Sequence, residues 1–232
     1  MTEMKTSEYR NYLEEIYCFL AICYLKEPKF VPMTALLEKN MEFLHKSLKG
    51  SELYKQVELC HTDWLAHTQF RRKIKEDYIR LFRQPIIVIP GLLPCETYYR
   101  DHHISMKQYT SKSSYEIVSF YKNACPDFVP DSGEAPDHIG NELIFAAKLA
   151  MEEVKADLSG IRVLAEHYAH LRCSFLAKHM LIWLPNFCRD VHEKASTAFY
   201  RTVANMTIDF VRQDYDNLQA RFQSERVPAG CC

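Results

Sequence analysis

Glycine is scarce in this sequence, with six residues among 232. Because glycine supplies the backbone conformations that tight turns need, its scarcity disfavours a turn-rich all-β fold. The sequence also has no phosphate-binding loop of the form G-x-x-x-x-G-K-[ST] or G-x-G-x-x-G, and no nucleophile elbow G-x-S-x-G. We therefore predict no bound nucleotide or other cofactor.

Long apolar runs and a strong charge imbalance are also absent. The longest apolar stretch, residues 86–93, is interrupted by Pro90 and Gly91, and a membrane span needs ~20 apolar residues. The first residues lack the basic-then-apolar order of a signal peptide. With 29 basic and 30 acidic side chains, the net charge of -1 gives no general attraction to nucleic acid or to an anionic membrane. We expect a cytoplasmic protein that neither binds nucleic acid nor inserts stably into a membrane.

The sequence has nine cysteines, an odd number, and no C-x-x-C pair. Most of them lie in apolar helical surroundings, where a free thiol behaves as a small apolar side chain. This usage indicates a reducing compartment and no disulfide framework. Cys231 and Cys232 end the sequence as a vicinal pair, and an exposed pair of this kind is a candidate for metal binding or oxidation.

Helical spacing of apolar residues dominates what is present. Tyr9, Leu13, Ile16, Tyr17 and Tyr24 form one stripe, which Pro28 ends. Prolines and a glycine between residues 84 and 100 exclude a continuous helix there, so we predict an ordered apolar loop. Further helices are predicted at residues 34–48, from Ser51 to Phe82 with a break near His61–Asp63, and at 102–110, 114–124, 137–157, 160–173, 175–192 and 195–224.

The predicted fold class is therefore all-α, a helical bundle in a single domain spanning 1–232. A loop rich in proline, aspartate and glycine at residues 126–136 divides this domain into two potential sub-lobes, 1–125 and 137–225. Such a loop is also a potential hinge for domain exchange, so a homodimer is one alternative for the oligomeric state.

Three histidine clusters are candidates for metal ligands. His167, His170 and Cys173 lie on one predicted helix face beside Glu166. They lack a convincing fourth zinc ligand, so histidines packed on a helix surface are the stronger interpretation. His102 and His103 point to different faces of a helix. The cluster of Cys60, His61, Asp63 and His67 is similarly weak.

Residues 134–145, with the sequence E-A-P-D-H-I-G-N-E-L-I-F, form the start of a helix. Pro136 suits a helix entry and Asp137 can cap open backbone N–H groups, so a capped core helix is one interpretation. His138 and Glu142 lie one turn apart, and the neighbouring acids Glu134 and Asp137 are expected to favour protonated His138. The other interpretation is a recognition site for a peptide that is basic at one end and apolar beyond.

Five segments resemble one known family, in the same order along the chain. The helix start, Pro-Asp-His-Ile-x-x-Glu-Leu-x-Phe, resembles the signature of the TorD/DmsD family of redox-enzyme maturation chaperones. Gln84 and Ala135 depart from residues that are usual in that family. The other segments are similar to its Leu-Phe-x-Gly-Pro run, its proline-then-aromatic stretch, its Leu-x-x-His-Leu-x-x-Trp segment and its Phe-Tyr element: Asp77–Pro85, Leu93–Tyr99, Phe175–Phe187 and Phe199–Arg201.

The resemblance implies an all-helical cytoplasmic chaperone that is not an enzyme. Its implied partner is the catalytic-subunit precursor of a molybdopterin-dependent oxidoreductase, bound through a twin-arginine signal peptide. Glu134, Asp137 and Glu142 are the candidate acceptors for the two guanidinium groups, since these prefer planar carboxylates. The remaining candidate contacts are Pro136 and His138 at the helix start, and Tyr78, Leu81, Phe82, Pro85, residues 86–89 and Tyr98 in an apolar groove.

Three alternatives remain open on the sequence alone. For Leu81, Phe82 and Trp183 core packing is the stronger interpretation, because large apolar side chains are usually buried. A second alternative is a metal-dependent enzyme that uses either His167, His170 and Cys173 or His138. A third is a helical scaffold that binds a folded partner.

Overall fold

A computed structural model describes residues 6–29, 33–35, 37–38, 52–83, 92–100 and 112–226 of the chain. Every regular element in these residues is helical, which confirms the predicted all-α class. One isolated antiparallel bridge joins Cys95 to His138. The elements are α1 (Thr6–Leu25), α3 (Glu52–Ala66), α4 (Thr68–Tyr78), η1 (Ile79–Arg83), α5 (Glu96–Arg100), α6 (Lys112–Ala124), α7 (Ile139–Leu158), α8 (Arg162–Phe175), η3 (Leu176–Met180), α9 (Leu184–Lys194) and α10 (Ala198–Arg226).

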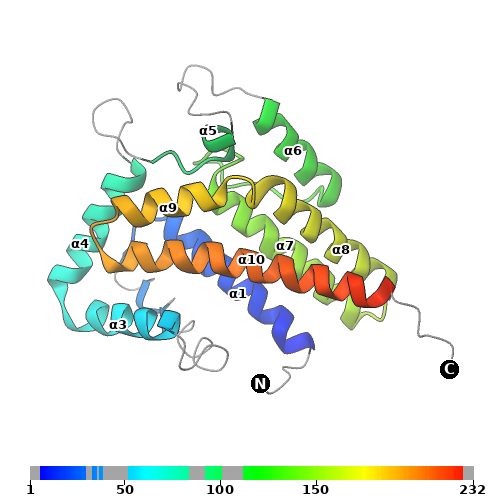
Figure 1. Cartoon of the computed structure of the whole chain (residues 1–232), viewed down its shortest axis with the longest axis horizontal. Coiled ribbons are helices and arrows are strands. Elements are labelled where there is room, and N and C mark those ends of the chain that lie inside the picture. The colour runs from blue at the N-terminus through cyan, green and yellow to red at the C-terminus, as the bar shows by residue number, and fades with distance from the viewer. Residues whose placement is uncertain are drawn as a thin grey trace.

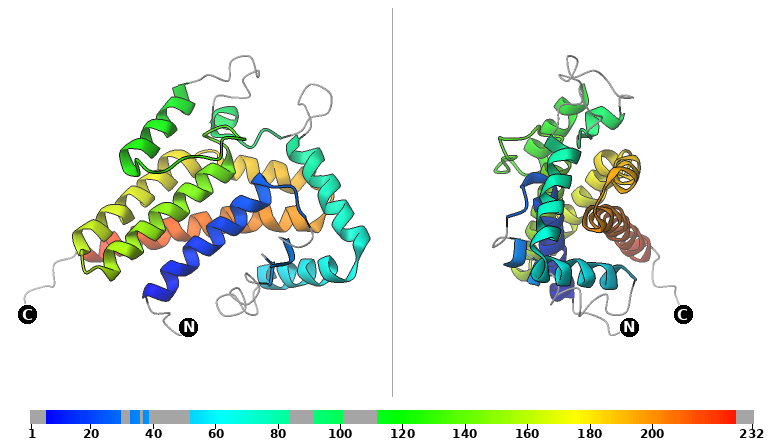
Figure 2. Two further views of the ribbon diagram at one scale, coloured as in Figure 1. Left: turned by 180° about the vertical axis from the view of Figure 1, so that it is seen from behind. Right: turned by 90° about the vertical axis from the view of Figure 1, so that its left-hand side faces the viewer.

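Four long helices form the centre of the molecule. Helix α1 packs along α7, and α7 packs along α8, while α10 runs beside α9 and α8. Figure 1 shows α10 crossing in front of α1 and α7, with α3 and α4 at one end of the bundle and α6 above α8. The view from behind in Figure 2 shows α1 and α7 side by side. Segments from both ends of the chain therefore enclose the same interior.

The interior is one continuous hydrophobic cluster. The apolar stripe predicted for the helix at 137–157 is buried as expected, with Ile139, Leu143 and Ala146 fully inaccessible. Side chains of α1, including Leu13, Tyr17 and Leu20, cover that stripe. The cluster thus crosses the boundary between the two expected sub-lobes, and the division at residues 126–136 stays a prediction.

Two predicted helix boundaries were wrong. No break occurs at His61–Asp63, because α3 continues to Ala66 and the chain turns at His67, whose backbone is extended. Helix α8 continues through the π-helical turn η3 instead of ending at residue 173, and the break falls between Met180 and Leu184. Pro185 explains that position, because proline lacks an N–H group and is tolerated only in the first turn of a helix.

Several predictions lie outside the described residues. They are the helix at 102–110, the helix at 34–48 beyond its first residues, the cap at Ser51, the apolar loop at 84–91 with Pro85, and the pair Cys231 and Cys232. Within the described ranges, no helix has both the length and the apolar composition needed to cross a bilayer.

Candidate functional site

The start of α7 is joined to a segment some forty residues earlier in the chain. The backbone N–H of Glu96 donates to the carbonyl of Asp137 at 2.9 Å, and the N–H of Ile139 donates to the carbonyl of Pro94 at 2.8 Å. These bonds flank the bridge between Cys95 and His138. The proline-then-aromatic stretch and the Pro-Asp-His motif therefore form a single site.

The helix caps at this site differ from the sequence prediction. His138, and not Asp137, is the N-cap of α7, and its Nδ1 accepts from the backbone N–H of Gly140 at 3.1 Å. The Asp137 carboxylate instead accepts from the backbone N–H of Thr97 at 3.0 Å, in the first turn of α5. Asp137 therefore stabilises the start of α5, where an acceptor for free N–H groups is favourable.

The protonation expected for His138 was wrong. Burial, together with the positive charge of Arg83, lowers the pKa of His138 to about 3, and the negative charge of Asp131 only partly opposes them. The Nε2 atom lies 3.9 Å from a Glu134 oxygen, which is too far for a hydrogen bond. A neutral imidazole is what the cap requires, because Nδ1 can accept a hydrogen bond only when it carries no proton.

Three carboxyl groups gather beneath this helix start. Glu96, Asp137 and Glu142 are all fully buried. Burial raises the pKa of Glu142 well above its ordinary value, and the neighbouring Glu96 and Asp137 raise it further. Since buried like charges repel, the site favours the protonated form of Glu142.

Specific partners hold this acid cluster. The indole N–H of Trp183 donates to Glu142 at 3.2 Å, so Glu142 does not pair with His138 as the sequence spacing suggested. Glu96 lies 3.1 Å from Nδ1 of His179 and accepts from Arg100 at 3.0 Å. Burial raises the pKa of Glu96, while His179 and Arg100 oppose that shift.

An arginine at the surface completes the site. Arg83, the last residue of η1, forms an ion pair with Glu134. Its Nε and Nη2 donate to the hydroxyl oxygen of Tyr78 at 2.9 and 2.7 Å, and Nη2 also donates to the carbonyl of Leu25 at 2.9 Å. The guanidinium carbon lies 5.3 Å from the centre of the Tyr78 ring, at cation–π distance.

The structure brings most of the predicted site residues together, at different depths. Asp137, His138, Glu142, Tyr78 and Leu81 are buried, and only Glu134, Pro136, Phe82 and Tyr98 are partly exposed. The Pro136 carbonyl accepts from the hydroxyl of Tyr121 at 3.1 Å. For Leu81 and Trp183 the core interpretation is confirmed, since they are 1% and 0% exposed.

Sequence reasoning missed four members of the site: Arg83, Glu96, His179 and Trp183. All four lie inside segments that were matched to the family, but no pattern in the neighbouring sequence indicates which residues they contact. The motif match was the available signal, because each of the four also contacts a residue that is distant in the sequence: Arg83 pairs with Glu134, Glu96 with His179, and Trp183 with Glu142.

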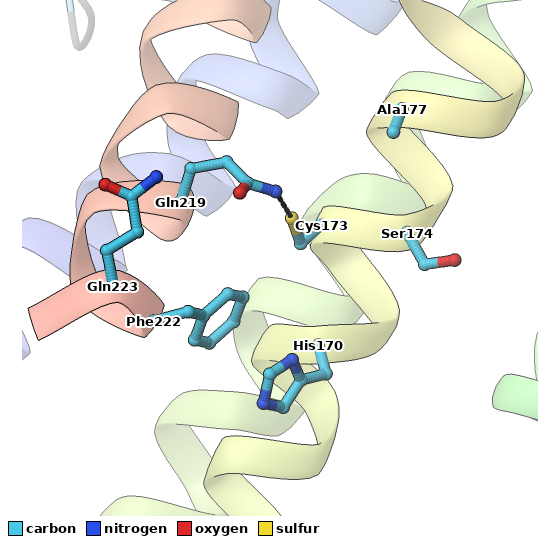
Figure 3. Close-up of a pocket in the computed structure, with 7 residues that line it drawn as sticks. All are labelled: His170, Cys173, Ser174, Ala177, Gln219, Phe222 and Gln223. Carbon is cyan, nitrogen blue, oxygen red and sulfur yellow. Dashed lines mark hydrogen bonds between the residues drawn. The ribbon is translucent and has the colours of Figure 1, made fainter. Parts of the chain in front are cut away.

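The proposed metal cluster on α8 is not assembled as a ligand set. The Sγ of Cys173 accepts from the side-chain amide of Gln219 at 3.1 Å, and the ring of His170 stacks on Phe222 at 3.9 Å between centroids. Glu166 pairs with Arg162. Figure 3 shows His170, Cys173, Gln219 and Phe222 around a surface pocket of about 310 Å³ between α8 and α10.

Of the other two histidine clusters, the structure describes only the one at residues 60–67. Cys60 is buried, and burial raises the pKa of its thiol to about 11. His102 and His103 lie outside the described residues. No group of three histidine, cysteine or acidic residues suited to a metal ion occurs in the part of the chain that the structure describes.

The fold and the site define an all-helical protein of the TorD/DmsD type, in which separated sequence motifs converge on the start of one buried helix. The chain belongs to the nitrate reductase delta subunit family, whose model matches residues 51–189. This match covers more than half of the chain and confirms the family that the motifs predicted.

Two curated relatives carry names that refer to reductase assembly. A perchlorate reductase assembly chaperone protein from Dechloromonas aromatica is 26% identical over 96 residues, which are 41% of this chain and 42% of the relative. A selenate reductase assembly chaperone protein from Thauera selenatis is 35% identical over 74 residues, 32% of this chain and 37% of the relative. The chain thus spans about two fifths of the length of the curated relatives it matches.

One solved structure has a similar course of the chain. It is the crystal structure of a candidate redox enzyme maturation protein from Archaeoglobus fulgidus, 18% identical, with a TM-score of 0.48 over 94% of this chain and 97% of that one.

Proposed function

We propose that this protein is a cytoplasmic assembly chaperone for a molybdopterin-dependent reductase, without catalytic turnover. Its partner is the precursor of the catalytic subunit, bound through a twin-arginine signal peptide until the cofactor is loaded. Family membership and the two assembly chaperones among the relatives support the chaperone class. The choice of signal peptide, client and compartment is part of the proposal.

The observation that carries the proposal is the ion pair of Arg83 with Glu134 at the surface of the site. It supports a role for Glu134 as an acceptor for guanidinium groups, because the carboxylate already holds one. Pro136, Asp137, His138 and Glu142 shape the backbone behind Glu134, since they cap, bridge or underlie the start of α7. Phe82 and Tyr98 are partly exposed, while Tyr78 and Leu81 are buried. In this proposal these four side chains supply the apolar contacts for the peptide.

The direct test is titration of the purified protein with a synthetic leader peptide that has two arginines followed by an apolar stretch. Replacing both arginines by lysine should weaken binding by roughly tenfold or more. Lysine cannot form a planar bidentate contact, and a charge-assisted hydrogen bond contributes about 1.5–3 kcal/mol. A charge placed in the apolar stretch should weaken binding as well.

Three outcomes separate the candidate functions. Binding that responds to both peptide changes supports the chaperone. A protein that ignores every leader peptide behaves as the scaffold alternative does, and the proposal fails. Metal near one equivalent after purification without chelator, with no leader binding, would instead favour the metal-dependent enzyme.

A further inference from the structure

The guanidinium of Arg83 lies in a receptor built by three separate elements. Tyr78 from α4 contributes its hydroxyl oxygen and its ring face, Leu25 contributes a carbonyl at the end of α1, and Glu134 contributes a carboxylate from the loop before α7. A planar group with five N–H donors and a flat face matches this set of acceptors. A carbonyl at a helix C-terminus also carries partial negative charge.

The receptor is anchored independently of Arg83. Tyr78 is 1% exposed, and its ring packs against those of Phe82 and Tyr200. Leu25 belongs to α1, and the loop around Glu134 is tied back by the N–H of Glu134, which donates to the carbonyl of Asp131 at 3.2 Å. The receptor therefore does not depend on the arginine for its shape.

Arg83 is the more accessible residue of its ion pair with Glu134. The side chain of Arg83 is 39% exposed, against 17% for Glu134. Asp77 and Glu96, which pair with Arg80 and Arg100, are fully buried, whereas Glu134 is partly exposed. More exposed carboxylates also pair with arginines, as Glu116 does with Arg100 and Glu76 with Arg72. The guanidinium of Arg83, in addition to its carboxylate, has the Tyr78 hydroxyl oxygen and the Leu25 carbonyl as acceptors.

We propose that Tyr78, Glu134 and the Leu25 carbonyl form an arginine-binding site that Arg83 fills in the free protein and that an arginine of the bound peptide takes over. The second half of this inference rests on the proposed function. The exchange is one guanidinium for another, so the charge-assisted hydrogen bonds are kept and Arg83 is released to water. Arg83 is then an internal competitor that lowers the apparent affinity for peptide in proportion to its occupancy.

The site itself can be tested without any leader peptide. The probe is N-acetylarginine amide, with N-acetyllysine amide as its counterpart, and the protein is the full chain carrying Arg83→Ala. Arg72→Ala is the matched control, because it removes an equal charge from α4 at an exposed i,i+4 pair with Glu76. Arg83→Gln serves as a second variant that keeps most of the side-chain stem.

We expect the arginine probe to bind both Arg83 variants at least roughly tenfold more tightly than wild type or Arg72→Ala, and to raise their melting temperatures. The lysine probe should not discriminate among the four proteins. Glu134→Gln added to Arg83→Ala should abolish the gain. Equal binding of the arginine probe to all variants would show that the vacated pocket is no guanidinium site and would overturn the inference.

A second titration, with the leader peptide, tests the exchange. Arg83→Ala and Arg83→Gln should bind the twin-arginine peptide more tightly than wild type does, and the lysine-substituted peptide should show no such gain. If wild type binds the leader but the Arg83 variants bind it no better, the exchange is wrong while the proposed function stands. If no protein binds the leader, the proposed function fails, and the acetylarginine titration still decides the site.

Discussion

At the scale of single residues, His138 shows how burial sets chemistry at this site. Its Nδ1 accepts a backbone hydrogen bond, and burial, helped by Arg83, lowers its pKa to about 3. The charged groups near it are Arg83, Asp131 and Glu134. An unfolded histidine titrates near pH 6.5. Between about pH 6.5 and pH 3, His138 is therefore protonated in the unfolded chain but neutral in the folded chain. The stability that neutral His138 contributes is lost as pH falls through this range.

We predict that His138→Gln removes this pH dependence. From about pH 7.5 to about pH 5, the variant should lose about 2 kcal/mol less stability than wild type, because one group then no longer differs in proton binding between the two states. The glutamine oxygen can still accept from Gly140, which limits the loss at neutral pH. Urea unfolding at a series of pH values measures this difference, with His192→Gln as an exposed control. Parallel pH profiles for wild type and His138→Gln would contradict it.

Glu142 affects the pH dependence of stability in the opposite direction from His138. Its pKa in the folded state is raised by burial and by the neighbouring acids. The stability linked to this group is fully present below about pH 4.5, where the unfolded carboxyl titrates, and is lost as pH rises toward the folded value.

We predict that Glu142→Gln makes the protein relatively more stable as pH rises through neutrality. A neutral amide resembles the protonated carboxyl in shape and still offers an oxygen to the indole N–H of Trp183. Thermal midpoints from acid to alkaline pH test this. If the thermal midpoint of wild type changes with pH in the same way as that of Glu142→Gln, Glu142 is not held protonated in the folded protein.

At the scale of elements, two π-helical turns carry the side chains that complete the site. The turn η1 ends at Arg83, which reaches Glu134, and η3 contains His179, which reaches Glu96. Both turns continue a preceding α-helix, α4 and α8, and π-helical turns are frequent at functional sites. The spacing of apolar residues does not reveal these π-helical turns, because one wider turn rotates the later side chains around the helix axis while the helix continues.

The contact of α1 with α7 depends on one glycine. A Cβ atom at Gly140 would lie 2.3 Å from Cγ of Leu25, a side chain that is 4% exposed. The end of α1 therefore meets the first turn of α7 without room for a methyl group. This close approach also sets the position of the Leu25 carbonyl beside Arg83.

We predict that Gly140→Ala lowers stability by about 1–2 kcal/mol, since overpacking costs about 1–3 kcal/mol and alanine regains up to about 1 kcal/mol of helix propensity. Chemical denaturation measures this loss. Leu25→Ala should relieve the clash, so the double variant should be less destabilised than the two single effects added together. A neutral or stabilising Gly140→Ala would show that α1 shifts at little cost.

At the scale of the whole molecule, a buried ionic network connects four helices. Arg172 of α8 lies 3.0 Å from Glu153 of α7 and 3.2 Å from Asp214 of α10. The hydroxyl of Tyr17 in α1 donates to Asp214 at 2.7 Å, and Arg221 donates to Glu153 at 2.7 Å. Arg172, Glu153 and Asp214 are buried and Arg221 is partly exposed. The network ties α10 to the bundle, because each charge has its partner on another helix.

We predict that Arg172→Leu destabilises the protein by about 3–5 kcal/mol, the usual cost of leaving buried partners uncompensated. The control Arg162→Leu removes an exposed i,i+4 pair with Glu166 and should cost at most about 1 kcal/mol. Urea unfolding compares the two variants. Equal, small losses for both would mean that the network contributes little to the fold.

The helical class and the family can both be predicted from the amino-acid sequence. The spacing of Ile139, Leu143 and Ala146 predicted a buried helix face because a 3.6-residue period places them on one side. The motif order predicted the family because it is a property of the chain and needs no coordinates.

The pairing of residues across the site depends on how the helices pack. Spacing assigned the cap of α7 to Asp137 and the partner of Glu142 to His138, whereas the fold gives the cap to His138 and pairs Glu142 with Trp183. Local spacing cannot anticipate a partner some forty residues away. The burial that keeps His138 neutral and Glu142 protonated is likewise created only when α1, α5, α7 and η3 close around the site, because desolvation depends on every neighbour in space.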